Sequence, residues 1–265
     1  MSQIKTKSSL GMWSQRLLSS IFLGGQVFVH LLKGKIHRRN TLEQMAAVGP
    51  DSLFIALLTA VFVGAVFTVQ VAREFIAFGA GNIVGGVLSV ALTRELSPVL
   101  TAVILAGRVG SAFAAEIGTM RVTEQIDALL ILKTDPVDYL VIPRVLACCL
   151  MLPILTLLSL VTGMTGGLII ATNLYNLSDT SFLDSARNFL SFWDIISAMV
   201  KAFCFGTFIA VIGCNWGLTT TGGAKGVGES TTTAVVTSLL VIFISNFFLT
   251  WVMFQGAGSA LLQGF

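Results

Sequence analysis

Long apolar runs are the feature that most restricts how this chain can fold. Hydrophobic residues make up 55% of the 265 residues and charged residues only 11%, whereas an average soluble domain has about 25% charged residues. A membrane-spanning helix needs about 20 apolar residues. Five runs reach that length, at about residues 52–72, 87–115, 145–171, 195–216 and 233–255. The sequence therefore predicts an all-α integral membrane protein with about five transmembrane helices.

The first 40 residues differ in character from the rest. We expect residues 1–40 to form an N-terminal amphipathic segment and residues 41–265 to form the transmembrane domain. Residues 8–32 mix apolar and polar side chains, which is typical of a helix lying on a membrane surface, and an additional span is the alternative. Thr41 followed by Gln44 fits a capping box that begins a short helix. A basic cluster supports contact with an anionic membrane surface and consists of Lys33, Lys35, Arg38 and Arg39.

The positive charges between the spans favour one orientation. Five spans place the two termini on opposite sides, and basic residues are enriched in cytoplasmic segments. With the N-terminus inside, the outer segments contain only Arg73 and Arg187. The inner segments then contain eleven basic residues, namely Lys5, Lys7, Arg16, Lys33, Lys35, Arg38, Arg39, Arg121, Lys133, Arg144 and Lys225. We therefore expect a cytoplasmic or stromal N-terminus and a C-terminus on the other side.

The second span contains charges that are costly in hydrocarbon. Arg94, Glu95 and Arg108 all lie within it, and such residues usually pair with other groups or mark a pathway. Arg94 and Glu95 are adjacent and point about 100° apart on a helix, so their partners should lie elsewhere. Pro98 removes the hydrogen bond that would return to the Arg94 carbonyl. A polar pocket or pathway is the favoured interpretation, and a purely structural ion-pair network is the alternative.

The lower part of the same span is rich in small residues, which allow another backbone to approach closely. This pattern fits tight helix packing or a moving interface, and it includes Gly107, Gly110, Ser111 and Ala114. Lys201 is a further cation within a span. It either snorkels or lines the same interior as the charges of the second span.

Two polar inserts interrupt the apolar pattern on the inner side. Residues 116–127 alternate polar and apolar side chains, which suits a short helix that meets the membrane or a partner, and a solvated loop is the alternative. After them, Asp135 is expected to cap the next helix, with Pro136 at its first position. The second insert, residues 217–236, is rich in glycine and threonine but contains no nucleotide-binding motif. The chain is therefore not expected to hydrolyse ATP itself.

Signatures of other protein classes are absent from the sequence. The only histidines, His30 and His37, lie in the N-terminal segment, so a His-based catalytic triad or zinc site within the membrane lacks residues. The basic residues lack the aromatic interleaving of a nucleic-acid interface. All four cysteines lie in apolar runs and do not suggest a disulfide framework. We therefore expect a transport protein without catalytic residues, metal or cofactor of its own.

One long motif in the second span resembles a known family. Residues 92–99 read L-x-R-E-L-x-P-V, residues 106–112 read A-G-R-x-G-S-A, and residues 115–125 read A-E-I-G-x-M-R-x-T-E-Q. This pattern is similar to the signature of the MlaE family of lipid permeases, and the resemblance extends over about residues 40–255. The resemblance implies an all-α membrane domain with a cytoplasmic coupling helix, whereas the first 40 residues match the family only in character.

The resemblance implies the permease subunit of an ABC transporter that moves phospholipids or related lipids between inner and outer membranes. A homodimer, a separate cytoplasmic ATPase that uses ATP and Mg²⁺, and an outer MCE-domain lipid-binding protein are implied as partners. Arg94, Glu95 and Pro98 would lie in the lipid pathway. The residues implied to couple to the ATPase are Glu116, Met120, Arg121, Glu124, Gln125 and Asp127.

The resemblance also implies a location in the inner membrane of a Gram-negative-type or cyanobacterial cell, or in the plastid inner envelope. Two other classes remain as alternatives. One is an ion-coupled carrier or channel that uses Arg94, Glu95 and Lys201, and the other is a membrane scaffold without a transport role. Dependence on a proton gradient without an ATPase partner would favour the carrier.

Overall fold

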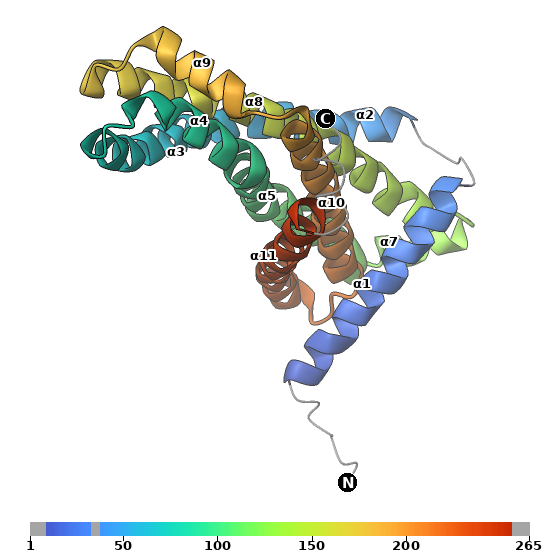
Figure 1. The fold of residues 1–265 in the computed structure, drawn as a ribbon. Coiled ribbons are helices and arrows are strands. Elements are labelled where there is room, and N and C mark those ends of the chain that lie inside the picture. The colour runs from blue at the N-terminus through green and yellow to red at the C-terminus, as the bar shows by residue number, and fades with distance from the viewer. Residues whose placement is uncertain (1–8, 33–37, 256–265) are drawn as a thin grey trace. The chain divides into compact units, whose positions relative to one another are not determined.

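Helices make up the fold of the described part of the chain. The computed structural model describes residues 9–32 and 38–255, and no β-strand occurs among them (Figure 1). In chain order the α-helices are α1 (Ser9–Leu32), α2 (Arg38–Val48), α3 (Pro50–Ala77), α4 (Val84–Ala91), α5 (Ser97–Leu105), α6 (Ser111–Val122), α7 (Gln125–Ile131), α8 (Ile142–Tyr175), α9 (Asp179–Phe189), α10 (Phe192–Leu218) and α11 (Gly223–Phe254). A short 3₁₀ turn, η1 (Gly81–Ile83), precedes α4, and three π-helical turns are η2 (Leu92–Leu96), η3 (Ala106–Gly110) and η4 (Val137–Val141).

Among the described residues, five helical stretches are long and apolar enough to cross a membrane. They are Arg38–Ala77, Gly81–Val122, Val137–Tyr175, Phe192–Leu218 and Gly223–Phe254. The prediction of an all-α membrane protein with five spans is therefore confirmed. The second span contains the π-helical turns η2 and η3, and the third contains η4. Such turns occur mostly as single insertions in α-helices and are frequent at functional sites.

Two compact units can be distinguished, and each draws on several helices. The first consists of residues 1–44, 106–147 and 207–240, and the second of residues 45–105, 148–206 and 241–265. The basic residues Lys33 and Lys35 of the expected N-terminal cluster lie outside the described residues.

In the second unit, α3 packs against α8 through small residues. Every fourth residue of α3 is buried, from Ser52 through Ala56, Ala60, Gly64 and Thr68 to Ala72. A Cβ atom at Gly64 would lie 1.9 Å from the Gly163 carbonyl oxygen, and one at Gly166 would lie 2.2 Å from the Val61 carbonyl oxygen. The two backbones are therefore in direct contact, which is how small residues drive helix packing in membranes.

Helix α9 in the same unit packs against α4. It lies in the polar connection between the third and fourth spans. The Gly86 amide donates to the Ser185 hydroxyl at 3.0 Å, and a Cβ atom at Gly85 would lie 2.1 Å from the Phe182 carbonyl oxygen. This contact fixes α4, which leads directly into the charged turn η2.

In the first unit, α1 is attached to α10 and α11 by polar contacts. The Trp13 indole donates to the Thr237 hydroxyl at 3.1 Å, and the Asn215 amide donates to the Arg16 carbonyl at 2.9 Å. Its inward face buries Leu23 and Val27. The opposite side exposes large apolar residues, Leu18, Ile21, Phe22, Phe28 and Val29. The exposed apolar face is suited to contact with lipid, which either an interfacial helix or an additional span would make.

Two local expectations need correction. Helix α2 already begins at Arg38, so Thr41 lies inside the helix and does not start it. Residues 116–127 do not form one short helix, because Glu124 adopts a left-handed conformation with φ of 62° and separates α6 from α7. Asp135 does cap its helix as expected, since its carboxylate accepts the Val137 amide at 2.8 Å.

Candidate functional site

The expected site in the second span begins with an unusual backbone turn. Residues Leu92–Leu96 form the π-helical turn η2, in which the Ser97 amide donates to the Leu92 carbonyl. Pro98 has no amide hydrogen to return to the Arg94 carbonyl. The Lys201 ammonium group takes its place and donates to that carbonyl oxygen at 2.7 Å. The loosened carbonyl expected from Pro98 is therefore satisfied by a cation from α10.

Glu95 is surrounded by hydrogen-bond donors. Lys201 Nζ contacts Glu95 Oε1 at 2.8 Å, and the Thr250 hydroxyl contacts the same oxygen at 2.9 Å. The Asn246 amide donates to Glu95 Oε2 at 2.7 Å. Lys201 also donates to Thr250, so its three protons have three partners. Helices α10 and α11 thus bind the Glu95 carboxylate from two sides.

Arg94 pairs with a different residue. Its Nε donates to Asp194 Oδ1 at 2.8 Å, and its guanidinium group lies 4.4 Å from the centre of the Phe254 ring. The other Asp194 oxygen accepts the Ser191 amide at 3.0 Å. Arg94 and Glu95 therefore have separate partners, which confirms that adjacent residues do not neutralise each other here.

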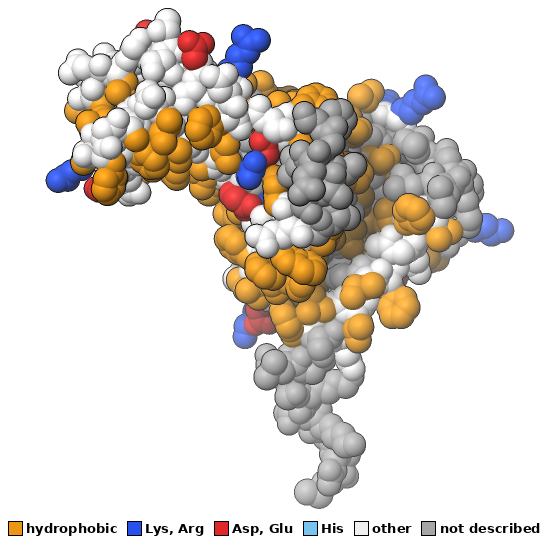
Figure 2. Space-filling model, in the orientation of Figure 1, with side chains coloured by type: hydrophobic (Ala, Val, Ile, Leu, Met, Phe, Trp, Pro, Cys, Tyr) orange, Lys and Arg blue, Asp and Glu red, His pale blue; other side chains and the backbone are white. Residues whose placement is uncertain are grey.

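Burial divides this charged network into an inner and an outer pair. The side chains of Lys201 and Asp194 are completely buried, whereas Arg94 is 36% and Glu95 41% exposed. Two positive and two negative side chains balance, so the network carries no formal net charge. Figure 2 shows a small group of acidic and basic side chains next to hydrophobic ones on the drawn face. The partners are buried, and the ends of Arg94 and Glu95 can be reached.

An apolar groove adjoins the network along the chain. It has a volume of about 490 Å³ and is lined by Leu58, Thr59, Phe62, Val63, Val66, Phe67, Gln70 and Leu96. Leu96 directly follows Glu95, so the groove and the network share the turn η2. Apart from Thr59 and Gln70, the lining side chains are hydrocarbon or aromatic. Such a surface can accommodate an acyl chain next to a polar group.

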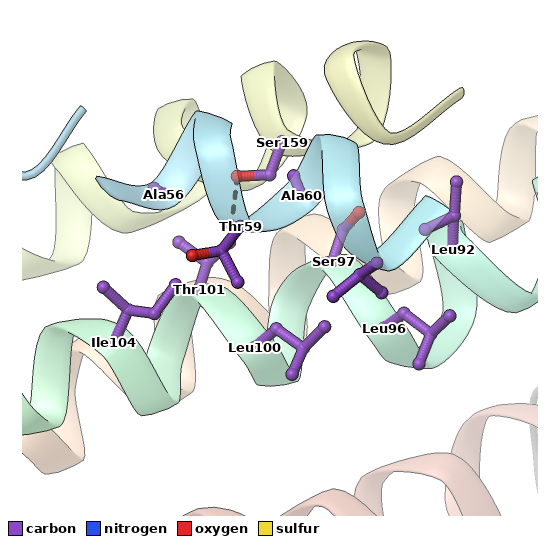
Figure 3. A pocket seen from close by; sticks show the side chains of 11 residues that line it. Ala56, Thr59, Ala60, Leu92, Leu96, Ser97, Leu100, Thr101, Ile104 and Ser159 are labelled. Carbon is purple, nitrogen blue, oxygen red and sulfur yellow. Dashed lines mark hydrogen bonds between the residues drawn. The ribbon is translucent and has the colours of Figure 1, made fainter. Parts of the chain in front are cut away.

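A small hydroxyl-lined pocket shares part of this lining. Thr59, Val63 and Leu96 belong to both cavities. Figure 3 shows Ser97, Thr101 and Ser159 at the smaller pocket, where the Thr101 and Ser159 hydroxyls are 3.2 Å apart. Its volume of about 10 Å³ is close to that of one water-sized probe. The pocket can hold a single water molecule but no lipid group.

The small residues expected at a packing seam do not all lie in the same environment. Gly110 and Ala114 are buried, and a Cβ atom at Gly213 of α10 would lie 2.8 Å from the Gly110 carbonyl oxygen. Gly107 has open space where a Cβ would be, and Ser111 donates to the Gly107 carbonyl. Gly110 and Ala114 thus serve packing inside the first unit, while Gly107 lies on its surface.

The residues implied to couple to the ATPase lie on α6, the following turn and α7. Glu116 and Met120 belong to α6, and Gln125 and Asp127 to the first turn of α7. Arg121 contacts Asp127 at 2.8 Å, with side chains 39% and 52% exposed. Glu116 contacts the buried Arg144 at 2.7 Å and is itself half exposed. These charges remain largely accessible.

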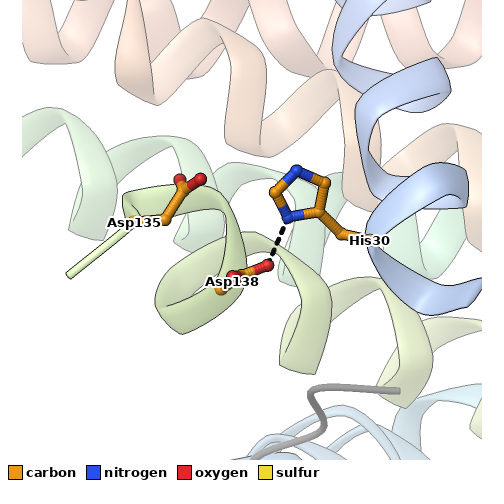
Figure 4. Close-up of side chains that lie close together, drawn as sticks. All are labelled: His30, Asp135 and Asp138. Atoms are coloured by element: carbon orange, nitrogen blue, oxygen red, sulfur yellow. Dashed lines mark hydrogen bonds and ion pairs between the residues drawn. The ribbon is translucent and has the colours of Figure 1, made fainter. Parts of the chain in front are cut away.

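One cluster offers potential metal ligands. Ligand atoms of His30, Asp135 and Asp138 lie within 4.8 Å of one another (Figure 4). His30 Nδ1 is hydrogen-bonded to Asp138 Oδ1, and Asp135 accepts the Val137 amide. These contacts attach α1 to η4 and cap the following helix. They explain the cluster without a metal ion.

Three residues of the network, Asp194, Asn246 and Thr250, were not identified from the sequence. Asp194 lies in the first turn of α10, next to the polar connection between two spans, where an acidic residue is unremarkable. Asn246 is a polar residue inside an apolar span, and this was the one signal that could have pointed to it. Thr250 carries no comparable signal, because hydroxyl groups are common in membrane helices.

Comparisons with known proteins agree with this architecture. Residues 41–252 match the family described as Permease MlaE. A probable ABC transporter permease protein of Synechocystis sp. is 67% identical over 99% of this chain and all of its own length. The protein TRIGALACTOSYLDIACYLGLYCEROL 1, chloroplastic, of Arabidopsis thaliana is 54% identical over 93% of this chain and 70% of its own. A probable ABC transporter permease protein of Pyropia yezoensis is 49% identical over 95% of both chains.

The family match and the relatives show that this five-span chain is a membrane transport subunit of the ABC permease class. Such a subunit is a transport component and not an enzyme, and its ATPase is a separate chain. The chain belongs to the MlaE permease family. The resemblance found in the motif of residues 92–125 is thereby confirmed.

Proposed function

We propose that this permease moves phospholipids or related lipids between the inner and outer membranes of its cell or organelle. The observation that carries the proposal is the charged network of Arg94, Glu95, Asp194 and Lys201 directly beside the apolar groove that includes Leu96. A lipid combines a charged headgroup with apolar chains, and this surface offers a partner for each. The Arabidopsis relative carries the name of a galactolipid, which agrees with a lipid cargo.

The exposed end of Arg94 is suited to a phosphate group. Asp194 binds its Nε edge, so the remaining guanidinium donors can contact a phosphate oxygen. Glu95 has the opposite role, because it retains Lys201 inside the protein and repels a second anion. In this proposal, Arg94 attracts one phosphate group and Glu95 disfavours a second, so the site binds one headgroup at a time.

The proposed assembly contains two copies of the chain and several partners. Each copy binds a cytoplasmic ATPase through Glu116, Met120, Arg121, Glu124, Gln125 and Asp127, and an MCE-domain protein binds lipid on the outer side. ATP and Mg²⁺ are bound by the ATPase. The N-terminus faces the cytoplasm or stroma, with eleven basic residues in the inner segments against two in the outer ones. The membrane is a bacterial inner membrane or the plastid inner envelope.

Movement follows from the chain order of the second span. In this proposal, closure of the ATPases on ATP shifts α6 and α7, and the surface that includes Gly107 allows the seam between the two copies to change width. The shift alters the access to Arg94 and Glu95, so that lipid is admitted or expelled. The direction of net transport is not specified by this scheme.

Copurified lipid and its transport test the site. Arg94→Ala and Glu95→Ala proteins, purified with their ATPase, should contain less phospholipid than the wild type and should transport it more slowly from labelled proteoliposomes. Arg187→Ala and Glu74→Ala are matched controls, because both side chains are exposed in the same unit. Equal lipid content and equal transport in all five proteins would show that the pocket assignment is wrong.

The same preparation separates the alternatives. Transport that depends on a proton gradient and not on ATP would support an ion-coupled carrier using Arg94, Glu95 and Lys201. A permease that binds no ATPase and transports nothing would support a scaffold. Lipid transport that requires ATP and the intact network supports the proposal.

A further inference from the structure

Four buried side-chain atoms of the described residues have no hydrogen-bond partner. They are Arg144 Nε, Trp216 Nε1, Ser238 Oγ and Asn246 Oδ1. The first three belong to the first unit, whereas Asn246 lies in the second unit and contacts the charged network. Buried polar atoms are nearly always hydrogen-bonded, and an exception calls for an explanation. Of the four, the Asn246 oxygen is the one beside charged side chains whose ends can be reached.

The orientation of the Asn246 amide follows from its contact with Glu95. Its nitrogen donates to Glu95 Oε2 at 2.7 Å. The reverse orientation would bring the amide oxygen against the carboxylate oxygen, and neither atom has a proton to donate. The oxygen is therefore the atom without a partner. Asparagine side chains in membrane helices usually form hydrogen bonds across helices, and Asn246 does so with only one half of its amide.

Glu95 has room for a further donor close to this oxygen. Among the described residues, its Oε1 accepts from Lys201 and Thr250, but its Oε2 accepts from Asn246 alone. An ionised carboxylate offers about four acceptor positions, and the Glu95 side chain is 41% exposed. The amide nitrogen and oxygen share one carbon atom, so Asn246 Oδ1 lies within about 5 Å of Glu95 Oε2. Two oxygens with unused acceptor positions therefore lie close together.

Arg94 adds a positive charge to these two acceptors. It directly precedes Glu95 in the turn η2, and its side chain is 36% exposed. In the proposed function, Arg94 binds the phosphate group of a lipid. The acceptors at Glu95 and Asn246 are then available to the group that is attached to the phosphate. Only a group with an O–H or N–H can use them, because an oxygen acceptor cannot bond to another acceptor.

Resting on the proposed lipid function, we propose that this site selects lipids whose phosphate carries a hydrogen-bond donor, either a hydroxyl or a primary ammonium group. Asn246 Oδ1 and Glu95 Oε2 accept from the donor, and Arg94 binds the phosphate. Asn246 is thus a specificity-determining residue. A site built to hydrogen-bond an O–H or N–H rejects an analogue without it strongly, because the polar atoms of the protein are then left unpaired.

Two matched pairs of short-chain lipids test the selection on the wild-type permease purified with its ATPase. Phosphatidylglycerol and phosphatidylethanol have the same charge, and only the first has hydroxyl groups. Phosphatidylethanolamine and phosphatidylcholine are both zwitterionic, and only the first has N–H donors. In calorimetric titrations with the dioctanoyl forms, the donor-bearing lipid should bind about five times more tightly than its counterpart, as expected for one additional hydrogen bond. A preference in the first pair identifies a hydroxyl group as the donor, and one in the second pair identifies an ammonium group.

Asn246→Leu connects the preference to the proposed acceptor. The variant removes the amide at similar side-chain volume, so the preference within a pair should fall below about twofold once this hydrogen bond is lost. Thr250→Val removes a donor from Glu95 Oε1 but leaves Asn246 in place, so it should reduce the preference less. Ser245→Ala is the matched control on the same helix, because the Ser245 hydroxyl donates to carbonyls of α11. If Asn246→Leu does not elute as a folded protein in size-exclusion chromatography, the smaller Asn246→Ala is titrated in its place.

The outcomes separate this inference from the proposed function. Equal binding within both lipid pairs would overturn the selection, although lipid would still be the cargo. A preference that Thr250→Val abolishes as completely as Asn246→Leu would show that the position of Glu95 alone decides it, and the role of Asn246 would be wrong. If none of the four lipids binds to the wild type, the lipid function fails and the selection fails with it.

Discussion

Charged residues at the turn η2 and at the end of α6 differ in their burial and in their partners. Around η2, the buried Lys201 and Asp194 bind Glu95 and Arg94, and uncharged groups fill the remaining hydrogen-bond positions. Around the end of α6, the Arg121–Asp127 pair is exposed on both sides. The first arrangement fixes the position of two reachable charges, and the second leaves charges free to exchange partners. The difference suits a cargo site in one region and a protein contact in the other.

The largest effect is expected from Lys201→Met, which removes the cation at the centre of the buried network. Glu95 and the Arg94 carbonyl would lose their shared donor, and breaking a buried ion pair typically costs about 3–5 kcal/mol. Thermal unfolding in detergent should show a strongly lowered midpoint or no folded protein. Lys225→Met, at an exposed pair, is the control. Equal stability of the two variants would remove the distinction between the regions.

Arg144→Met should have an intermediate effect, because the Arg144–Glu116 pair joins one buried and one exposed side chain. Arg144 is buried and donates to the Leu140 carbonyl, while its partner Glu116 is half exposed and can be hydrated when it is left alone. We expect a loss of about 1–3 kcal/mol, the cost of hydrogen bonds to a charged group. Comparison with Glu116→Gln measures the pair, since that variant retains the buried arginine. A loss as large as that of Lys201→Met would contradict the assigned order.

The comparison also shows how far the sequence is informative. Apolar length predicts the five spans, and the adjacency of Arg94 and Glu95 correctly predicts separate partners, because helix geometry alone decides both. Asp194 lies 100 residues from Arg94 along the chain, and no local pattern connects them. The four-residue stripe from Ser52 to Ala72 could have been recognised by its spacing. The break at Glu124 could not, because no glycine or proline marks it.

Arg94→Lys should have a smaller effect than either of the two preceding variants. The positive charge remains, but the planar group that lies over Phe254 and the Nε that binds Asp194 are lost. We expect stability to fall by about 1 kcal/mol, in the range of a cation–π contact with one hydrogen bond. Lipid copurification should fall as well, because an ammonium group does not offer the same donors to phosphate. Full lipid content would show that charge alone suffices at this position.

The smallest effect on stability should follow from exchanging the exposed pair in an Arg121→Asp, Asp127→Arg double variant. Exposed ion pairs contribute about 0–1 kcal/mol, and the exchanged pair keeps both charges, so the unfolding midpoint should remain within error of the wild type. Binding of the ATPase should nevertheless weaken, because the partner meets the charges in reversed positions. The corresponding exchange of Arg94 and Asp194 should prevent folding, since Asp194 also accepts the Ser191 amide and no arginine can do so. An exchange that is harmless to both stability and ATPase binding at residues 121 and 127 would show that this pair is only a solvated surface, and the coupling contact would then have to lie elsewhere in the first unit.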